Sequence, residues 1–200
     1  MSRVSLVQKN QASPEVNELF QRIEDNGAKV MNLYRAMANS PHVTRNLIKL
    51  GNSLISKTDL SPKLRELTIM RIARLCDCEY EWAQHTPVAL HSGVSQTQLD
   101  VIDSWKESDD FTDEECAVLQ YVDEVAQNVK VADKTFEALK QHLSERNIVE
   151  LTLAIGWWGM LARFLVPLEV ELDEQSVASV GDLIGHGLEG GYPGGNLPGQ

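Results

Sequence analysis

The chain has few of the features that mark secreted and membrane-spanning proteins. It contains three cysteines, and two of them, Cys76 and Cys78, stand one residue apart. An odd number of cysteines, with no sign of secretion, argues against a structural disulfide framework. No uninterrupted run of about eighteen apolar residues is present, and the first residues, MSRVSLVQKNQASPEV, lack the apolar stretch of a signal peptide. We therefore expect a cytoplasmic protein that has no membrane partner.

Basic residues are also scarce. The 200 residues include 18 Lys and Arg against 29 Asp and Glu, which gives a formal net charge of −11. Such a chain repels a polyphosphate backbone, so we expect no nucleic-acid partner. Hydrophobic residues make up 42% of the sequence and charged residues 24%. This balance is typical of one soluble domain with a sizeable core.

Alternating β-type runs are nearly absent, and helix signals recur along the whole chain. Three Ser-Pro pairs fit helix starts, with Ser as the cap and Pro in the first turn: 13–14, 40–41 and 61–62. Two capping boxes predict further starts, Ser95 with Gln98 and Thr112 with Glu115, and Asp133 is a third cap. Gly93 fits a helix stop. The sequence therefore predicts an all-α fold.

The chain divides into three regions by composition. We expect N-terminal helices over 1–57 that pack on the core, a helical core over 58–170, and a Gly/Pro-rich tail over 171–200. The core ends in an apolar helix over 148–166, which Pro167 stops and which must be largely buried in the core or at a subunit contact. Its paired tryptophans, Trp157 and Trp158, fit packing better than substrate binding. The tail holds eight of the thirteen glycines, so it is expected to be flexible.

Residues 76–85, CDCEYEWAQH, concentrate reactive side chains in three helical turns. On a regular helix Cys78, Glu81 and His85 lie within about 60° of one another, whereas Cys76 and Cys78 diverge too far for a disulfide. Trp82 lies beside His85 and would exclude water from a nearby pocket, and Pro87 is expected to kink the helix. A structural histidine, a surface Glu–His pair and a buried, inert cysteine are the bland alternatives.

The stretch SPKLRELTIMRIARLCDCEYEWAQHTPVALHSGVSQTQLDVI resembles the carboxymuconolactone decarboxylase family, which includes alkylhydroperoxidase D. The likeness is strongest over about 58–130. In the hydroperoxidase branch a Glu is followed after twelve positions by a Cys, after three more by a second Cys and after four more by a His. This chain has Glu66, Cys78, Glu81 and His85 at those positions, so Glu81 replaces the second cysteine. The resemblance implies an alkylhydroperoxidase D-like helical bundle whose central helical hairpin carries the site, assembled as a trimer or hexamer.

That replacement favours acid/base chemistry over peroxide reduction. A dithiol peroxidase needs a second thiol to resolve the sulfenic acid, and a neighbouring carboxylate opposes thiolate formation. We therefore expect a lyase that decarboxylates a small carboxylated lactone or related ring compound without a cofactor. His85 would be the acid/base, oriented by Glu66, with Glu81 as a proton relay or an anion-excluding group. Arg71 or Arg74 would hold the substrate carboxylate and Trp82 would line the site.

Three other interpretations stay open from the sequence. Cys78 alone would serve a thiol-dependent hydroperoxidase that an external thiol resolves. The chain would otherwise be an oligomeric small-molecule-binding protein with a relic site. Glu66, Glu81 and His85 would suit a divalent metal, although helical E-x-x-x-H is too common to support a metal site.

Overall fold

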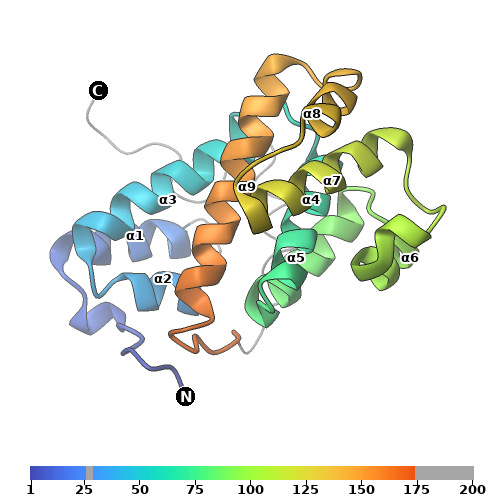
Figure 1. Cartoon of the computed structure of the whole chain (residues 1–200). Helices are drawn as coiled ribbons and strands as arrows, with labels where there is room; N and C mark the ends of the chain where they lie inside the picture. The colour runs from blue at the N-terminus through green and yellow to red at the C-terminus, as the bar shows by residue number, and fades with distance from the viewer. Residues whose placement is uncertain (26–28, 174–200) are drawn as a thin grey trace. The chain divides into compact units, whose positions relative to one another are not determined.

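The computed structural model describes residues 1–25 and 29–173. These residues form nine α-helices and two short 3-10 helices, and no strand occurs among them (Figure 1). The all-α prediction is confirmed. Most of the predicted tail over 171–200, from residue 174 onward, lies outside the described residues.

Two compact units divide the chain. The first comprises residues 1–57 and the chain from Pro167 onward, and the second comprises residues 58–166. The first unit holds the 3-10 helix η1 (Lys9–Gln11) and the helices α1 (Pro14–Asp25), α2 (Asn32–Met37) and α3 (Pro41–Ser56). Its two ends of chain meet, because the Arg3 backbone N–H donates to the Leu168 carbonyl at 2.8 Å. A small apolar cluster forms its core: Val16, Phe20, Ile23, Val30 and Ala38.

The second unit is built around one helix, α4 (Pro62–Leu75). Around it are α5 (Glu79–His91), α6 (Gln96–Val101), the 3-10 helix η2 (Ile102–Glu107), α7 (Asp113–Asn128), α8 (Asp133–Lys140) and α9 (Glu145–Leu165). Helix α4 packs against α5, α7 and α9, and its residues 64–73 are all buried. Since this buried stretch includes Arg65, Glu66 and Arg71, the centre of the unit contains charged groups that need partners.

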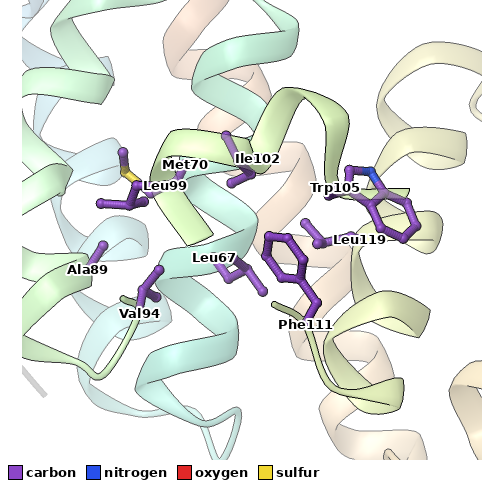
Figure 2. Packing of buried hydrophobic residues seen from close by; sticks show 9 residues of the cluster. All are labelled: Leu67, Met70, Ala89, Val94, Leu99, Ile102, Trp105, Phe111 and Leu119. Carbon is purple, nitrogen blue, oxygen red and sulfur yellow. The ribbon is translucent and has the colours of Figure 1, made fainter. Parts of the chain in front are cut away.

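An apolar cluster joins the hairpin of α4 and α5 to the helices that follow it (Figure 2). Leu67 and Met70 of α4 and Ala89 of α5 contribute to one part of the cluster. The remaining members come from the segments after α5: Val94, Leu99, Ile102, Trp105, Phe111 and Leu119. Burial of these side chains, about 1.5–3 kcal/mol for each large one, fixes the hairpin that positions the site.

The local start and stop signals mostly hold. The side chain of Ser61 accepts a hydrogen bond from the Leu64 N–H, and both predicted capping boxes form. Gly93 has a φ of +95°, in the left-handed region, and ends α5 as predicted. The prediction for Asp133 is wrong by one residue, since Ala132 occupies the N-cap position of α8 and makes no side-chain cap.

Helix α9 is buried along one side and exposes several apolar side chains on the other. Trp158 is 2% exposed, whereas Val149 and Leu153 are 58% and 54% exposed. By length and composition alone α9 would be able to cross a membrane, but 61% of its apolar window is buried inside the protein. Core helices of soluble proteins pass the same test, so this is weak support for a membrane span.

Candidate acid/base site

The turn between α4 and α5 determines where the site residues lie. Asp77 has a φ of +50°, and the Cys78 N–H reaches back to the Ala73 carbonyl at 2.8 Å while the Asp77 N–H donates to the Arg74 carbonyl at 3.2 Å. This is a Schellman turn, which ends one helix before the next begins. Cys78 is consequently the N-cap of α5 and not part of a helix that continues to residue 86. The regular helix assumed for Cys78, Glu81 and His85 is therefore wrong at its first residue, Cys78.

Glu81 and His85 remain on one face of α5, four residues apart, as predicted. The calculated divergence of Cys76 and Cys78 no longer applies, because a turn and not a helix separates them; all three cysteines are free. Helix α5 continues through Pro87 to His91.

A buried carboxylate orients His85. Oε2 of Glu66 lies 2.8 Å from Nδ1 of His85, and the Glu66 side chain is 2% exposed. The other oxygen, Oε1, accepts a hydrogen bond from Nε of Arg65 at 3.1 Å. The buried guanidinium of Arg65 thus forms an ion pair with Glu66. An ionised carboxylate only accepts, and therefore Nδ1 of His85 carries the proton.

Trp158 of α9 holds the opposite side of the imidazole. Its indole Nε1–H donates to Nε2 of His85 at 3.3 Å, and the two rings are nearly perpendicular, at 87°. An indole N–H can only donate, so Nε2 must present its lone pair. Together, Glu66 and Trp158 select the neutral Nδ1–H tautomer of His85. The sequence predicts only packing for Trp158, because no spacing signal links it to a histidine 73 residues earlier.

Glu81 is buried without comparable partners. It is 3% exposed, and apart from the Cys78 thiol neither carboxyl oxygen has a hydrogen-bond partner among the residues that the structure describes. Burial raises its pKa to about 8, against a smaller lowering by the hydrogen bond with Cys78. Glu81 is thus mainly a neutral carboxylic acid at pH 7, which makes it a proton donor rather than an anion.

Cys78 is a poor thiolate in these surroundings. The residue is 1% exposed, and burial first and the Glu81 carboxylate second raise the pKa of its thiol to about 12. Cys76 is more accessible, and burial raises the pKa of its thiol as well, while the nearby Arg163 lowers it. Attack on a peroxide requires the thiolate, so neither environment favours it.

The three predicted substrate-binding residues have other partners. Nε of Arg71 donates to Oδ1 of Asp123 at 2.7 Å, inside the protein. Nε of Arg74 donates to Oδ2 of Asp103 at 2.8 Å, and its guanidinium lies 5.2 Å from the centre of the Trp82 ring. Trp82 itself packs against the apolar cluster of Figure 2. No hydrogen bond or ion pair among the described residues joins either arginine to Glu66 or His85, while Trp82 is three residues before His85 on α5.

The metal interpretation gains no geometric support. Within residues 1–25 and 29–173, no group of three His, Cys, Asp or Glu side chains has an arrangement that would hold a metal ion. Glu66 and His85 bond directly to each other instead.

Residues 41–124 match the model of the carboxymuconolactone decarboxylase family. The resemblance to this family is therefore confirmed over that stretch of the chain. The match begins in α3, earlier than the stretch that carried the resemblance, and ends in α7.

Among curated relatives, the uncharacterized protein YnjA of Escherichia coli is 31% identical over 116 residues, which are 57% of this chain and 63% of YnjA. The uncharacterized protein YdfG of Bacillus subtilis is 24% identical over 102 residues, 50% of this chain and 69% of YdfG. The chain therefore covers less than two thirds of YnjA.

Solved structures share the fold. The alkylhydroperoxidase AhpD core of a peroxidase-related protein from Ralstonia eutropha superposes with a TM-score of 0.78 at 15% identity, over 90% of this chain and 96% of that one. The debrominase Bmp8 has a TM-score of 0.70 at 18% identity, over 88% and 95% of the two chains. A protein of unknown function from Agrobacterium tumefaciens has a TM-score of 0.65 at 26% identity, over 70% and 96%. The AhpD-like bundle is thereby confirmed, and its central hairpin of α4 and α5 carries the site residues.

Proposed function

We propose that this protein is a cofactor-free acid/base enzyme that decarboxylates a small carboxylated lactone or related ring compound. The observation that carries the proposal is the 2.8 Å contact between the buried Glu66 and His85, one helical turn from the buried Glu81, whose pKa burial raises to about 8. The match of residues 41–124 to the family model supports decarboxylase or alkylhydroperoxidase-like chemistry in general. The choice between the two rests on the state of the individual side chains.

The reaction needs one electron sink and one proton. When the carbon–carbon bond to the carboxylate breaks, carbon dioxide leaves and the electron pair moves into the adjacent carbonyl of the substrate as an enolate. Glu81, with a pKa of about 8, then donates its proton to the carbanionic carbon. The hydrogen bond from Trp158 to Nε2 of His85 then breaks, and Nε2 takes up a proton from solvent. His85 passes this proton to Glu81, which restores the acid. Glu66 keeps the imidazole in the correct tautomer throughout.

This division of roles refines the expectation from the sequence. His85 was expected to be the acid, but both of its nitrogens are engaged in a way that fits the neutral imidazole. For Glu81 the sequence predicts either a proton relay or a group that excludes competing anions. Its protonated state at neutral pH favours the role of acid, because a catalytic acid works best when its pKa is near the working pH.

Thiol-dependent peroxide reduction is the less favoured chemistry. The pKa of about 12 for Cys78 leaves very little thiolate at neutral pH. The debrominase neighbour shows that other reactions occur on this fold: a second structure of Bmp8, in which a cysteine is replaced by alanine, holds 2,3,4-tribromopyrrole. At 18% identity this likeness carries only the fold to the present chain.

A substrate panel with matched variants tests the proposal. Small carboxylated lactones and organic hydroperoxides are offered to the wild type, and carbon dioxide release and peroxide consumption are measured. For a lactone that is turned over, His85→Gln and Glu81→Gln should each lower kcat by at least about 100-fold, whereas Cys78→Ser should change it little. Peroxide consumption that Cys78→Ser abolishes, with trapping of a sulfenic acid at Cys78, would instead establish the peroxidase.

We also propose that the protein acts in the cytoplasm as a homo-oligomer, a trimer or a hexamer. The exposed apolar side chains Val149, Leu153 and Met160 on α9 support self-assembly, since a monomer would leave them in water. Native mass spectrometry measures the subunit count. A monomer at micromolar concentration would contradict this part of the proposal.

A further inference from the structure

The acid/base site as described contains no group that would bind an anionic substrate. The arginines at 65, 71, 74 and 146 each pair with a carboxylate of the protein. Arg163 on α9 differs, because no acidic side chain among the described residues forms an ion pair with it. Its Nη1 donates to the carbonyl of Gly159 in its own helix at 2.7 Å. The positive charge of Arg163 is therefore available to a ligand.

Gly159 leaves room for this guanidinium. A Cβ atom built on Gly159 would lie 3.1 Å from Nη1 of Arg163, which is closer than most Cβ contacts. The absence of a side chain allows Arg163 to lie back along α9 over the preceding turn. That turn begins at Trp158, the residue whose indole contacts His85. Trp158 and Gly159 are thus neighbours in the chain. The Trp158 indole donates to His85, and the Gly159 carbonyl accepts from Arg163.

The path of α9 brings Arg163 to the end of α4 where the acid lies. Near its start, Oε2 of Glu150 accepts the N–H groups of Asp59 and Leu60, directly before α4. Thirteen residues later, about 20 Å along the axis, α9 has advanced by about the length of α4. At that level is the turn with Cys76, whose thiol responds electrostatically both to Arg163 and to Glu81. Arg163 and Glu81 therefore approach the same short segment from two helices.

We propose that Arg163, positioned by Gly159, binds the anionic group of the substrate at this site. The proposal rests on the proposed function for the identity of the reaction, but not for the binding of an anion. It assigns to Arg163 the role that the sequence suggested for Arg71 or Arg74. The substrate class is a small carboxylate, which the guanidinium would hold beside the proton donor Glu81.

Cys76 provides a local probe that needs no substrate. In a Cys116→Ser background, Cys76 is the accessible thiol, because Cys78 is buried. Its labelling rate is measured with dithiobisnitrobenzoate, which carries carboxylates, and with the neutral reagent dithiodipyridine. The ratio of the two rates cancels any change in thiolate fraction. Arg163→Gln should lower the ratio about two- to fivefold, as expected for the loss of one partly screened charge, and Arg163→Lys should largely preserve it.

Two matched controls separate a local effect from a general one. Lys130→Gln removes one exposed positive charge elsewhere and should leave the ratio unchanged. Gly159→Ala should shift the guanidinium slightly and lower the ratio less than Arg163→Gln does, whereas Gly156→Ala, where an added Cβ meets nothing within 4 Å, should leave the ratio unchanged. Circular dichroism checks that each variant is folded. An unchanged ratio in Arg163→Gln, or an equal fall in Lys130→Gln, overturns the assignment of Arg163 and leaves the acid/base proposal to its own test of turnover.

Discussion

Two glutamates of the central hairpin, Glu66 on α4 and Glu81 on α5, are buried to nearly the same extent, 2% and 3% exposed. Glu66 accepts hydrogen bonds from a guanidinium and an imidazole. Glu81 has only the thiol of Cys78 nearby, and its pKa rises to about 8. Burial by itself therefore does not decide the charge of a carboxyl group in this protein. The hydrogen-bond donors around the group also matter: Glu66 has two of them, whereas Glu81 lacks comparable donors and its pKa is raised.

Removing Glu66 should have the largest effect on stability. Glu66→Ala leaves the buried Arg65 without its carboxylate partner and His85 without its Nδ1 acceptor. We expect a loss of about 3–5 kcal/mol in the free energy of unfolding, measured by urea denaturation. The double variant Arg65→Met with Glu66→Leu should lose less, since no unbalanced charge remains. A loss below about 1 kcal/mol in Glu66→Ala would mean that the pair is not buried as described.

Replacing Glu81 should change how stability depends on pH. The folded-state pKa is raised from 4.5 to about 8, so the native protein holds a proton that the unfolded chain releases above pH 4.5. Wild-type stability should then fall as pH rises from about 5 through 8 and level off above it. Glu81→Gln, which mimics the neutral acid, should abolish this fall and be more stable than wild type at pH 9 by about 2–4 kcal/mol.

The matching measurement is a series of urea denaturation curves between pH 5 and pH 9 for both proteins. Near pH 5 the two should have similar stability, because Glu81 is protonated there in the folded state. Parallel pH profiles would show that Glu81 is ionised like Glu66, and the contrast between the two glutamates would be lost.

Removing the indole donor should have a smaller effect. Trp158→Phe keeps the aromatic ring but removes the 3.3 Å hydrogen bond to Nε2 of His85, so we expect a loss of about 1 kcal/mol in stability. Nitrogen NMR of the imidazole should show the Nδ1–H tautomer in the wild type at pH 8. A wild-type spectrum of the Nε2–H tautomer would contradict the arrangement of Glu66, His85 and Trp158.

The smallest effect is expected from Cys78. Its thiol is the one group that lowers the pKa of Glu81, so Cys78→Ala should raise that pKa further, by a fraction of a unit. The midpoint of the fall in stability with pH would move upward by the same amount. This midpoint, and not the absolute stability, is the quantity to compare, because the substitution also leaves a small cavity. A downward shift would mean that the thiol does not interact with Glu81 favourably.

The ends of the two hairpin helices show what the sequence was able to predict. Both end in Schellman turns, with Gly93 at the left-handed position after α5 and Asp77 at that position after α4. Glycine is the usual residue at the left-handed position, so the end of α5 was predictable. Asp77 is a weaker signal for the end of a helix, so the helix of Glu81 and His85 is expected from the sequence to include Cys78. The helical register of Glu81 and His85 survived because both lie beyond that turn.

Contacts between distant segments were the least predictable part of the site. The spacing in the family pattern indicated Glu66 and His85 together, and the structure places them 2.8 Å apart. Trp158 and Arg163 belong to α9, whose composition indicated only burial. Their relation to the hairpin depends on how α9 packs along α4, and no local pattern in the sequence encodes that register.

The isolation of Glu81 also means that this position can accept another residue at little cost to the fold. Among the described residues only the Cys78 thiol bonds to the carboxyl oxygens of Glu81, so exchanging this residue leaves no guanidinium, amide or imidazole there without a partner. Cysteine at this position would restore the dithiol spacing of the hydroperoxidase branch without disturbing the scaffold that fixes His85. Residue 81 can thus be exchanged without touching Glu66, which Arg65 and His85 hold in place.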